Sequence, residues 1–334
     1  MLQTLFSKTV GLIALVIAVV FLIYCSLAMG QLSISFRAVW QVIMNYDPSN
    51  TEHIVIATSR LARAVIALVV GMTFAVAGIL VQALTRNPLA APDLIGVNSG
   101  AIFFIVLAIT WLNLQSLNHY MWFAFLGAAI SGLAVFFLSS IGRDGLTPIK
   151  IIIAGTALSA LFISFTQGLL VIDEQSIQTV LFWIAGSIAG RDISLLLSVL
   201  PILLGALVLS MLIGKSMNIF SSGDDVAKSL GLNVGLLKIV MGILIIVLAG
   251  GSVAVVGSIG FVGLIVPHIA KRLVGTDYRW ILPYGALIGS FLLLAADISA
   301  RFIIIPQEVP IGVMTAIIGG PFFIYLAKKG VSKQ

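Results

Sequence analysis

Long apolar segments separated by short polar breaks run along the whole chain. Because about 20 apolar residues cross the hydrocarbon core of a bilayer, the breaks at charged, proline and glycine residues delimit about ten segments of spanning character. These segments lie near residues 9–30, 62–84, 96–112, 119–140, 150–171, 192–214, 236–256, 258–274, 281–298 and 309–327. The pattern predicts an all-α polytopic membrane protein in which residues 1–334 form a single transmembrane domain.

Three parts of this pattern are less regular. The segments near 96–112 and 258–274 are short or interrupted by glycine, which leaves the number of spans open by about one or two. Residues 177–190, between the fifth and sixth segments, are expected to form a short re-entrant or interfacial helix. The first apolar run, residues 10–29, exceeds the apolar region of about 7 to 15 residues found in signal peptides, and is expected to stay in the protein as its first span.

The Lys and Arg residues are distributed unevenly between the polar breaks. An even number of spans places both termini on one side of the membrane. If that side is cytoplasmic, most of the 18 Lys and Arg residues lie inside, and those outside are Arg37, Arg60, Arg63, Arg191 and Arg301. This distribution obeys the positive-inside rule, and the opposite orientation violates it. The sequence therefore predicts cytoplasmic termini, and it explains the net charge of +6 by topology, without nucleic acid as a partner.

The composition agrees with a lipid environment. Hydrophobic residues make up 60% of the chain and charged residues 9%, against about 25% charged residues in soluble proteins. These values exclude a soluble enzyme, a nucleic-acid-binding domain and a disordered chain. Cys25 has no second cysteine for a disulfide or a thiolate cluster, and His268 has neither His53 nor His119 placed to complete a metal site. No metal or directly bound cofactor is expected.

The interiors of the expected spans are almost free of ionisable residues, since Asp297 and His268 lie near the ends of their segments. Transporters driven by ion gradients usually place Asp, Glu or His near mid-membrane, because coupling needs a group there that titrates or coordinates an ion. Gly257, Gly260 and Gly263 lack the preceding strand and the Lys-Ser/Thr pair of a phosphate-binding loop. The driving energy is therefore expected to come from another subunit, and an ion-coupled secondary transporter is the alternative class.

A stretch between the sixth and seventh segments is too polar to insert into the bilayer. It carries acidic residues in its first turn, ends in glycine and has Val226 and Leu230 on one helical face. This pattern predicts a short helix with an exposed apolar ridge. Two interpretations stay open: a solvated connector, or a helix held in a groove of a cytoplasmic partner. The residues concerned are Gly223, Asp224, Asp225, Val226, Lys228, Leu230 and Gly231.

Two further patterns concern contacts inside the bilayer. The second segment has small residues every three or four positions, at Ala67, Gly71, Ala75 and Gly78. Such a stripe favours close approach of another helix. The fifth segment has polar residues within one broad helical face, at Thr156, Ser159 and Gln167. These three are candidates to line a transport pathway, although hydroxyl and amide groups also join helices.

Longer motifs follow one another in a characteristic order. They are Arg60-Leu-Ala-Arg63, Gln82 followed by Arg86-Asn-Pro-Leu-Ala-Ala-Pro92, Gly96-Val-Asn-Ser-Gly-Ala101, Gly257-Ser-Ile-Gly-Phe-Val-Gly-Leu-Ile-Val-Pro-His268, Ala296-Asp-Ile-Ser-Ala-Arg301 and Glu308-Val-Pro-Ile-Gly312. Together they resemble the FecCD family, whose members are permease subunits of ABC importers for ferric siderophores, haem and cobalamin. The resemblance extends from about Arg60 to Ala327. Ala62 departs from it, since family members commonly have Pro at this position.

The resemblance implies a transport subunit rather than an enzyme, in the membrane of a bacterial cell. It implies a second permease subunit, the same or homologous, together with two cytoplasmic ATPases that hydrolyse ATP and an external binding protein that delivers the substrate. Ferric siderophores are the expected substrate, and haem or cobalamin are the alternatives.

The resemblance also assigns roles to particular residues. The stretch from Gly223 to Gly231 matches the coupling region that sits on the ATPase. Arg60, Arg63 and Arg301 match outward-facing arginines that receive Glu side chains of the binding protein, which guanidinium groups can hold by paired, charge-assisted hydrogen bonds. The alternatives are ordinary interfacial arginines and, for Arg301, a simple pair with the aspartate four positions earlier.

Overall fold

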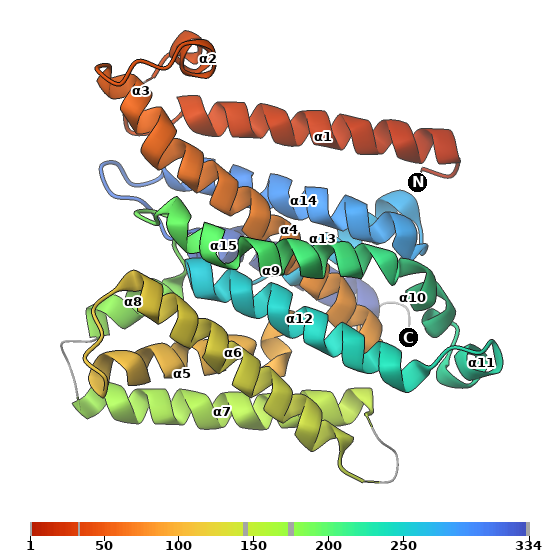
Figure 1. Ribbon diagram of the computed structural model, residues 1–334. Helices are drawn as coiled ribbons and strands as arrows, with labels where there is room; N and C mark the ends of the chain where they lie inside the picture. The colour runs from red at the N-terminus through yellow and green to blue at the C-terminus, as the bar shows by residue number, and fades with distance from the viewer. Residues whose placement is uncertain (1, 33, 143–145, 173–176, 332–334) are drawn as a thin grey trace.

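The computed structural model describes residues 2–32, 34–142, 146–172 and 177–331, and no β-strand occurs within these ranges. Helices packed side by side make up the molecule (Figure 1). The elements are α1 (Leu5–Ala28), α2 (Phe36–Met44), α3 (Thr51–Val55), the π-helical turn η1 (Ile56–Arg60), α4 (Leu61–Thr85), the 3-10 turn η2 (Pro92–Ile95), α5 (Val97–Thr110), α6 (Leu117–Ser140), α7 (Pro148–Ile172), α8 (Ile177–Ala185), α9 (Ile193–Leu212), α10 (Gly214–Ser221), α11 (Asp224–Ser229), α12 (Val234–Val256), α13 (Val262–Val274), α14 (Tyr278–Ala300) and α15 (Ile311–Val331).

Seven helices in the described part of the chain are long and apolar enough to cross a membrane. One of them is the continuous helix formed by α3, η1 and α4, which has 35 residues, and the others are α1, α6, α7, α9, α12 and α14. Shorter apolar helices are α5 and Ile311–Ile324 within α15. The all-helical, multi-pass architecture expected from the sequence is confirmed, and the total number of spans stays a prediction.

Each apolar segment expected from the sequence corresponds to a helix, with several boundaries shifted by a few residues, and two differences have a clear backbone cause. The eighth segment begins at Val262 rather than near 258, because Gly257 and Phe261 take positive φ angles of 82° and 68° that interrupt the helix. The short helix expected over residues 177–190 ends at Ala185, where Gly186 turns the chain with a φ of 65°. Glycine takes this conformation without a steric penalty because it has no Cβ atom.

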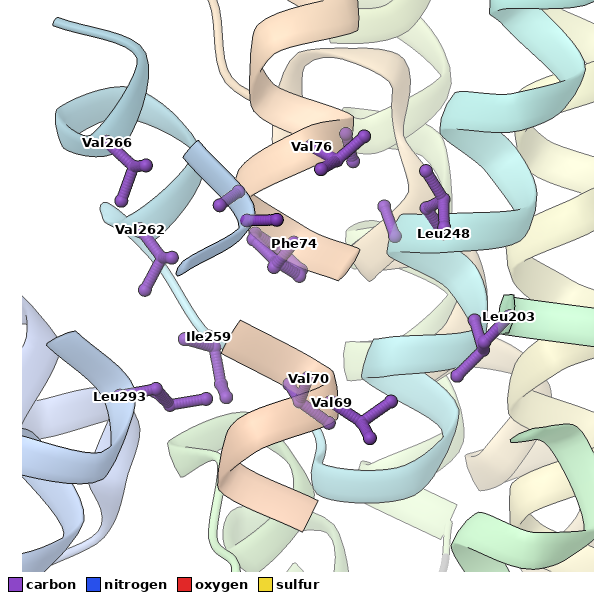
Figure 2. Packing of buried hydrophobic residues seen from close by; sticks show 14 of the residues in the cluster. Val69, Val70, Phe74, Val76, Leu203, Leu248, Ile259, Val262, Val266 and Leu293 are labelled. Carbon is purple, nitrogen blue, oxygen red and sulfur yellow. The ribbon is translucent and has the colours of Figure 1, made fainter. Parts of the chain in front are cut away.

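Helix α4 lies at the centre of the bundle and packs against α12, α13 and α14. Figure 2 shows Phe74 and Val76 of α4 in one apolar cluster with Leu248 of α12 and Val262 of α13. All four side chains are buried. A displacement of α4 therefore requires the helices packed against it to move as well, because a close-packed core transmits strain.

Glycines let two helices approach α4 closely. A Cβ atom added to Gly71 would lie 2.5 Å from the carbonyl oxygen of Gly289 in α14, and one added to Gly78 would lie 2.1 Å from that of Gly263 in α13. No side chain fits at these distances. The prediction that the glycines of this stripe permit close helix packing is confirmed.

The bundle has two polar ends. Helices α1 and α14 run antiparallel, because Tyr284 near the start of α14 donates a hydrogen bond to the carbonyl oxygen of Lys8 (2.6 Å), while Arg301 after α14 donates to that of Met29 (2.7 Å). The end that holds Arg301 and the start of α4 is called the arginine end below. The opposite end, where α4 finishes and α11 lies, is called the α11 end (Figure 1).

Candidate functional site

The three arginines that the sequence proposes as docking residues meet around one small pocket at the arginine end, called the arginine pocket below. Its volume is about 160 Å³, and its lining consists of Gly30, Gln31, Leu32, Val55, Ser59, Arg60, Arg63, Arg301 and Glu308. The fold thus brings together the segment after α1, the region where η1 joins α4, and the segment between α14 and α15. The partners of the three guanidinium groups decide what this pocket can bind.

Arg60 is held by the residues that end α1. Its Nη1 atom donates hydrogen bonds to the carbonyl oxygens of Leu27 (2.9 Å) and Ala28 (2.5 Å), and its Nη2 atom donates to that of Leu32. Carbonyl groups in the last turn of a helix lack partners within the helix, so they are available to such a donor. Arg60 is 6% exposed, which means that its guanidinium lies inside the protein.

Arg63 bridges two carboxylates. Its Nε atom donates to Oδ1 of Asp297 at 2.7 Å, and its Nη1 atom donates to Oε2 of Glu308 at 2.6 Å. The side chains of Arg63 and Glu308 are 13% and 23% exposed, whereas that of Asp297 is 1% exposed. Of the three arginines, Arg63 has the best access to solvent.

Arg301 forms an ion pair with Asp297, four residues earlier on α14. It also donates to the carbonyl oxygens of Ser26 and Met29 and to the Ser26 hydroxyl, each at 2.7 Å. The structure therefore shows the pair with Asp297 that the sequence left open as an alternative. Arg60 and Arg301 are buried, because the end of α1 and the Asp297 carboxylate supply internal partners.

A larger cavity lies beside the arginine pocket and is called the outer cavity below. It encloses about 770 Å³ and is lined by Leu117, Trp183, Ser187, Ala189, Gly190, Arg191, Gln307, Glu308 and Pro310. Glu308 lines both spaces and stands between them. The volume falls within the range of about 300–1,000 Å³ that is typical of small-molecule sites.

Arg191 is the cationic residue of the outer cavity. Its Cζ atom lies 4.1 Å from the centroid of the Trp183 ring, and burial lowers the pKa of its guanidinium to about 10. The group is therefore charged at neutral pH. The sequence pattern places Arg191 outside the membrane without singling it out, because its contact with Trp183 depends on the turns at Gly186 and Gly190, both of which have positive φ.

At the opposite end, the polar stretch after α10 folds into the short helix α11, which begins at Asp224 and ends at Ser229. Val226 and Leu230 are 47% and 65% exposed, whereas Ala227 between them is fully buried. The two exposed residues form an apolar ridge that points away from the bundle. Helix α10, which precedes this stretch, is an element that the sequence pattern does not indicate.

Asp224 attaches α11 to the rest of the bundle. Its Oδ1 atom accepts a hydrogen bond from Nη2 of Arg86 (2.5 Å), and its Oδ2 atom accepts one from Nζ of Lys238 (2.8 Å). Burial raises the pKa of Asp224, but the hydrogen bonds and charges of Lys238 and Arg86 outweigh it, and the net pKa lies below the ordinary value. Arg86 follows α4 and Lys238 belongs to α12, so α11 is joined to two central helices.

The candidate pathway residues Thr156, Ser159 and Gln167 lie on α7. Among the seven long apolar helices in the described ranges, this helix is the least covered by the rest of the protein. Only 17% of its most apolar 18-residue stretch is buried. Thr156 and Gln167 are exposed and Ser159 is half-buried. The Thr156 hydroxyl donates back to the carbonyl oxygens of Ile152 and Ile153 at 3.0 Å, so it does not join α7 to a neighbouring helix.

A polar cluster that the sequence does not indicate lies where two helical segments are interrupted. Asn98 donates through Nδ2 to Oδ1 of Asp93 in η2 (2.5 Å) and to Oγ of Ser258 before α13 (3.0 Å). Helix α13 has 13 residues. A helix of that length rises about 20 Å, so Ser258 lies far from the basic residues at the other end of α13. The interiors of the long helices are poor in ionisable groups, as expected. An ionisable group, Asp93, is instead placed on η2, the turn between α4 and α5.

These features define a class of protein. The described helices have apolar surfaces suited to lipid, enclosed charges beside two cavities at one end, and an exposed apolar ridge at the other. Within the described ranges, no group of three or more His, Cys, Asp and Glu side chains is arranged to hold a metal ion. The architecture is that of a multi-pass membrane protein, as expected for a transport permease.

Comparisons with known proteins place the chain within this class. The profile of the FecCD transport family matches residues 17–329. The chain is 47% identical to the Probable siderophore transport system permease protein YfiZ of Bacillus subtilis (strain 168), over 97% of each protein. It is 40% identical to the Fe(3+)-citrate import system permease protein YfmD of the same organism, over 97% of this chain and 96% of the relative.

A solved structure agrees with these relatives. An inward-facing conformation assigned to the metal-chelate type of ABC transporter has a TM-score of 0.84 with this chain at 31% sequence identity. The similarity covers 95% of this chain and 98% of the solved chain. The protein therefore belongs to the FecCD transport family, as its motifs predict.

Proposed function

We propose that this chain is the membrane-spanning permease subunit of an ABC importer that carries ferric siderophores across a bacterial cell membrane. The observation that carries the proposal is the similarity, over almost the full length, to siderophore and ferric citrate permeases. The distribution of Lys and Arg supports an orientation in which the arginine end faces outward and the α11 end faces the cytoplasm. Haem and cobalamin are alternative substrates of the same class of importer.

The permease works together with other subunits. A second permease, either another copy or a homologue, completes the pathway, and two cytoplasmic ATPases supply energy by hydrolysing ATP. The uncovered face of α7 supports a place for this helix beside the pathway, with Thr156, Ser159 and Gln167 as its polar groups. Side chains of this kind hold a charged complex weakly, because they offer hydrogen bonds but no compensating charge.

Helix α11 passes the motion of the ATPase to the permease. Its ridge of Val226 and Leu230 has the spacing of a helix that lies in a groove of a partner. The pairs of Asp224 with Arg86 and Lys238 connect a displacement of α11 to α4 and α12. Because α4 packs at the centre of the bundle, this connection shifts the balance between the two states of the pathway.

The external binding protein docks over the arginine pocket. Arg60, Arg63 and Arg301 bring three positive charges there, and Asp297 and Glu308 supply two negative charges. The net positive charge suits a carboxylate of the arriving protein. Arg63 exchanges Glu308 for that carboxylate, while Arg60 and Arg301 hold the end of α1 in place and contribute to the field.

Reconstitution tests this function. The permease and its ATPases are placed in proteoliposomes. The binding protein is first titrated with several ferric siderophores, and it is then loaded with the one that it binds. Uptake of iron is expected to require ATP hydrolysis and the binding protein, and to be insensitive to dissipation of the ion gradients. Uptake that follows an ion gradient without ATP would establish the secondary transporter instead. If added haem or cobalamin abolishes uptake of the ferric siderophore, the competing compound is the substrate instead.

A further inference from the structure

The outer cavity contains a positive charge, on Arg191, for which the described residues supply no paired carboxylate. Within the described part of the chain, Arg191 forms no ion pair, and its polar contact is a long hydrogen bond from Nε to the carbonyl oxygen of Ser187 (3.4 Å). The carboxylate that shares the cavity, Glu308, is held by Arg63 on the side of the arginine pocket. Arg191 is half-buried, and a partly desolvated guanidinium without a carboxylate is costly unless something else compensates it.

The position of the guanidinium shows how a ligand reaches it. It covers one face of the Trp183 ring, and Trp183 is 1% exposed. A guanidinium that stacks on an aromatic ring by its face keeps its N–H groups in its own plane, where they can hold a planar oxygen group by two parallel hydrogen bonds. Within the described residues, the side-chain hydrogen bond of Arg191 uses Nε, so its Nη atoms remain available as donors beside the Trp183 ring.

The remaining lining restricts the class of ligand. Leu117, Ala189, Gly190 and Pro310 are apolar or small, and they supply surface but no charge. A cavity of about 770 Å³ is too large for an inorganic anion alone and is suited to a small molecule. The chemistry fits a metal chelate with an anionic oxygen group at its edge, such as a carboxylate or catecholate.

We propose that Arg191, supported by Trp183, binds an anionic oxygen group of the transported chelate in the outer cavity, and that this contact selects anionic over neutral chelates. The inference rests on the proposed function for the identity of the ligand as cargo. The cavity lies beside the arginine pocket, so a chelate released by a docked binding protein enters it before it reaches the pathway. Selectivity then has a second stage in the permease, weaker than that of the binding protein.

The test measures chelate binding by the permease–ATPase complex in nanodiscs, without the binding protein. Equilibrium dialysis with radiolabelled iron compares ferric citrate as the anionic probe with a neutral ferric trihydroxamate. Loss of a charge-assisted hydrogen bond is expected to weaken ferric citrate binding about tenfold or more in Arg191→Gln, and by a smaller factor in Arg191→Lys, which keeps the charge but loses the paired donors. The neutral probe is expected to bind all variants alike, which also shows that they are folded.

Arg37→Gln is the matched control, because Arg37 is exposed on α2 at the same end and loses the same charge. No saturable binding of ferric citrate by the unaltered complex, or an affinity that Arg191→Gln leaves unchanged, overturns the proposal. So does an equal loss for both probes. If Arg191→Gln instead weakens docking of the binding protein without any effect on ferric citrate binding, Arg191 belongs to the protein interface.

The failure of this inference can be distinguished from failure of the proposed function. ATP-dependent uptake in proteoliposomes tests the importer, and binding of ferric citrate tests Arg191. Charge-selective binding without ATP-dependent uptake refutes the importer alone. Uptake that is normal and equally efficient in Arg191→Gln and in the unaltered protein refutes the selectivity site alone.

Discussion

The two ends of the bundle contain ion pairs of similar geometry in opposite surroundings. At the arginine end, Asp297 and Arg301 have side chains that are 1% and 3% exposed. At the α11 end, Asp224 and Arg86 have side chains that are 32% and 43% exposed. Each aspartate accepts hydrogen bonds from two cationic side chains, so the main difference between them is access to water.

This difference separates two uses of charge. A desolvated pair that loses one partner leaves a buried charge uncompensated, so the arginine end holds its geometry firmly. A half-exposed pair can exchange its partner for water at small cost, so α11 can be attached to the bundle and still be moved by another protein. The first arrangement suits the docking surface proposed for the arginine end, and the second suits the coupling role proposed for α11.

The largest effect is expected from Asp297→Asn. The substitution removes the charge that compensates Arg63 and Arg301, and the free energy of unfolding is expected to fall by about 3–5 kcal/mol. Denaturant titration in mixed micelles measures it. Ser299→Ala, at an exposed position on the same helix, is the control and should change stability by less than about 0.5 kcal/mol. A loss below about 1 kcal/mol for Asp297→Asn would mean that water reaches this pair.

The second effect concerns the ridge of α11. Val226→Asp combined with Leu230→Asp is expected to reduce ATP-dependent uptake at least about tenfold, because a carboxylate in an apolar groove is left unsolvated. Stability should change by less than about 0.5 kcal/mol, since both residues are exposed. Ser221→Asp combined with Ser222→Asp adds the same two charges at exposed positions just before α11 and serves as the control. Unchanged uptake in the double variant would remove the ridge from the mechanism.

The third effect concerns docking at the arginine pocket. Arg63→Gln is expected to weaken the affinity of the binding protein by about threefold to tenfold, and the loss should shrink at high salt because the pocket opens to water. Surface plasmon resonance at two ionic strengths measures it. Arg37→Gln, at the same end but exposed on α2, should have no effect. If both variants lose affinity equally, the general positive charge of this face accounts for docking.

The smallest effect is expected from Asp224→Asn, the counterpart of Asp297→Asn at the other end. The stability cost should not exceed about 1 kcal/mol, because the pairs with Arg86 and Lys238 are partly solvated. The folded-state pKa of Asp224 is lowered, so its contribution is present above the ordinary aspartate pKa of about 4 and disappears as pH falls through the lower folded value. Urea titrations from pH 7 downward should show the variant and the unaltered protein converging. A cost equal to that of Asp297→Asn would erase the contrast between the ends.

The apolar segments could be located from the sequence because the signal is local. The length of a spanning helix depends on the thickness of the bilayer, and the breaks between helices depend on nearby proline, glycine and charged residues. The errors fall where the backbone turns inside the bundle. The positive φ angle of Phe261, which delays the start of α13, depends on packing that no local pattern reports.

The motifs identify the candidate docking residues as a group, but they do not report the surroundings of those residues. Arg63 is 234 residues from Asp297 in the sequence and 245 residues from Glu308. The packing of α1, α4 and α14 decides that Arg60 and Arg301 are enclosed. Neither Arg191 nor Asp93 stands out in the sequence as a site residue, since a lone charge near a turn carries no signal of a cavity or a buried cluster.

Residue order alone was enough to predict a helical membrane permease, because hydrophobic length and ordered motifs are properties of neighbouring residues. The packing of the helices, which the residue order does not report, determines which charged side chains have access to water. A helix that packs against another creates both the low-polarity surroundings and the partner, and the free energy of a charge depends on both. That is why Asp224 and Asp297, similar in the sequence as acidic residues near helix ends, differ at the two ends of the bundle.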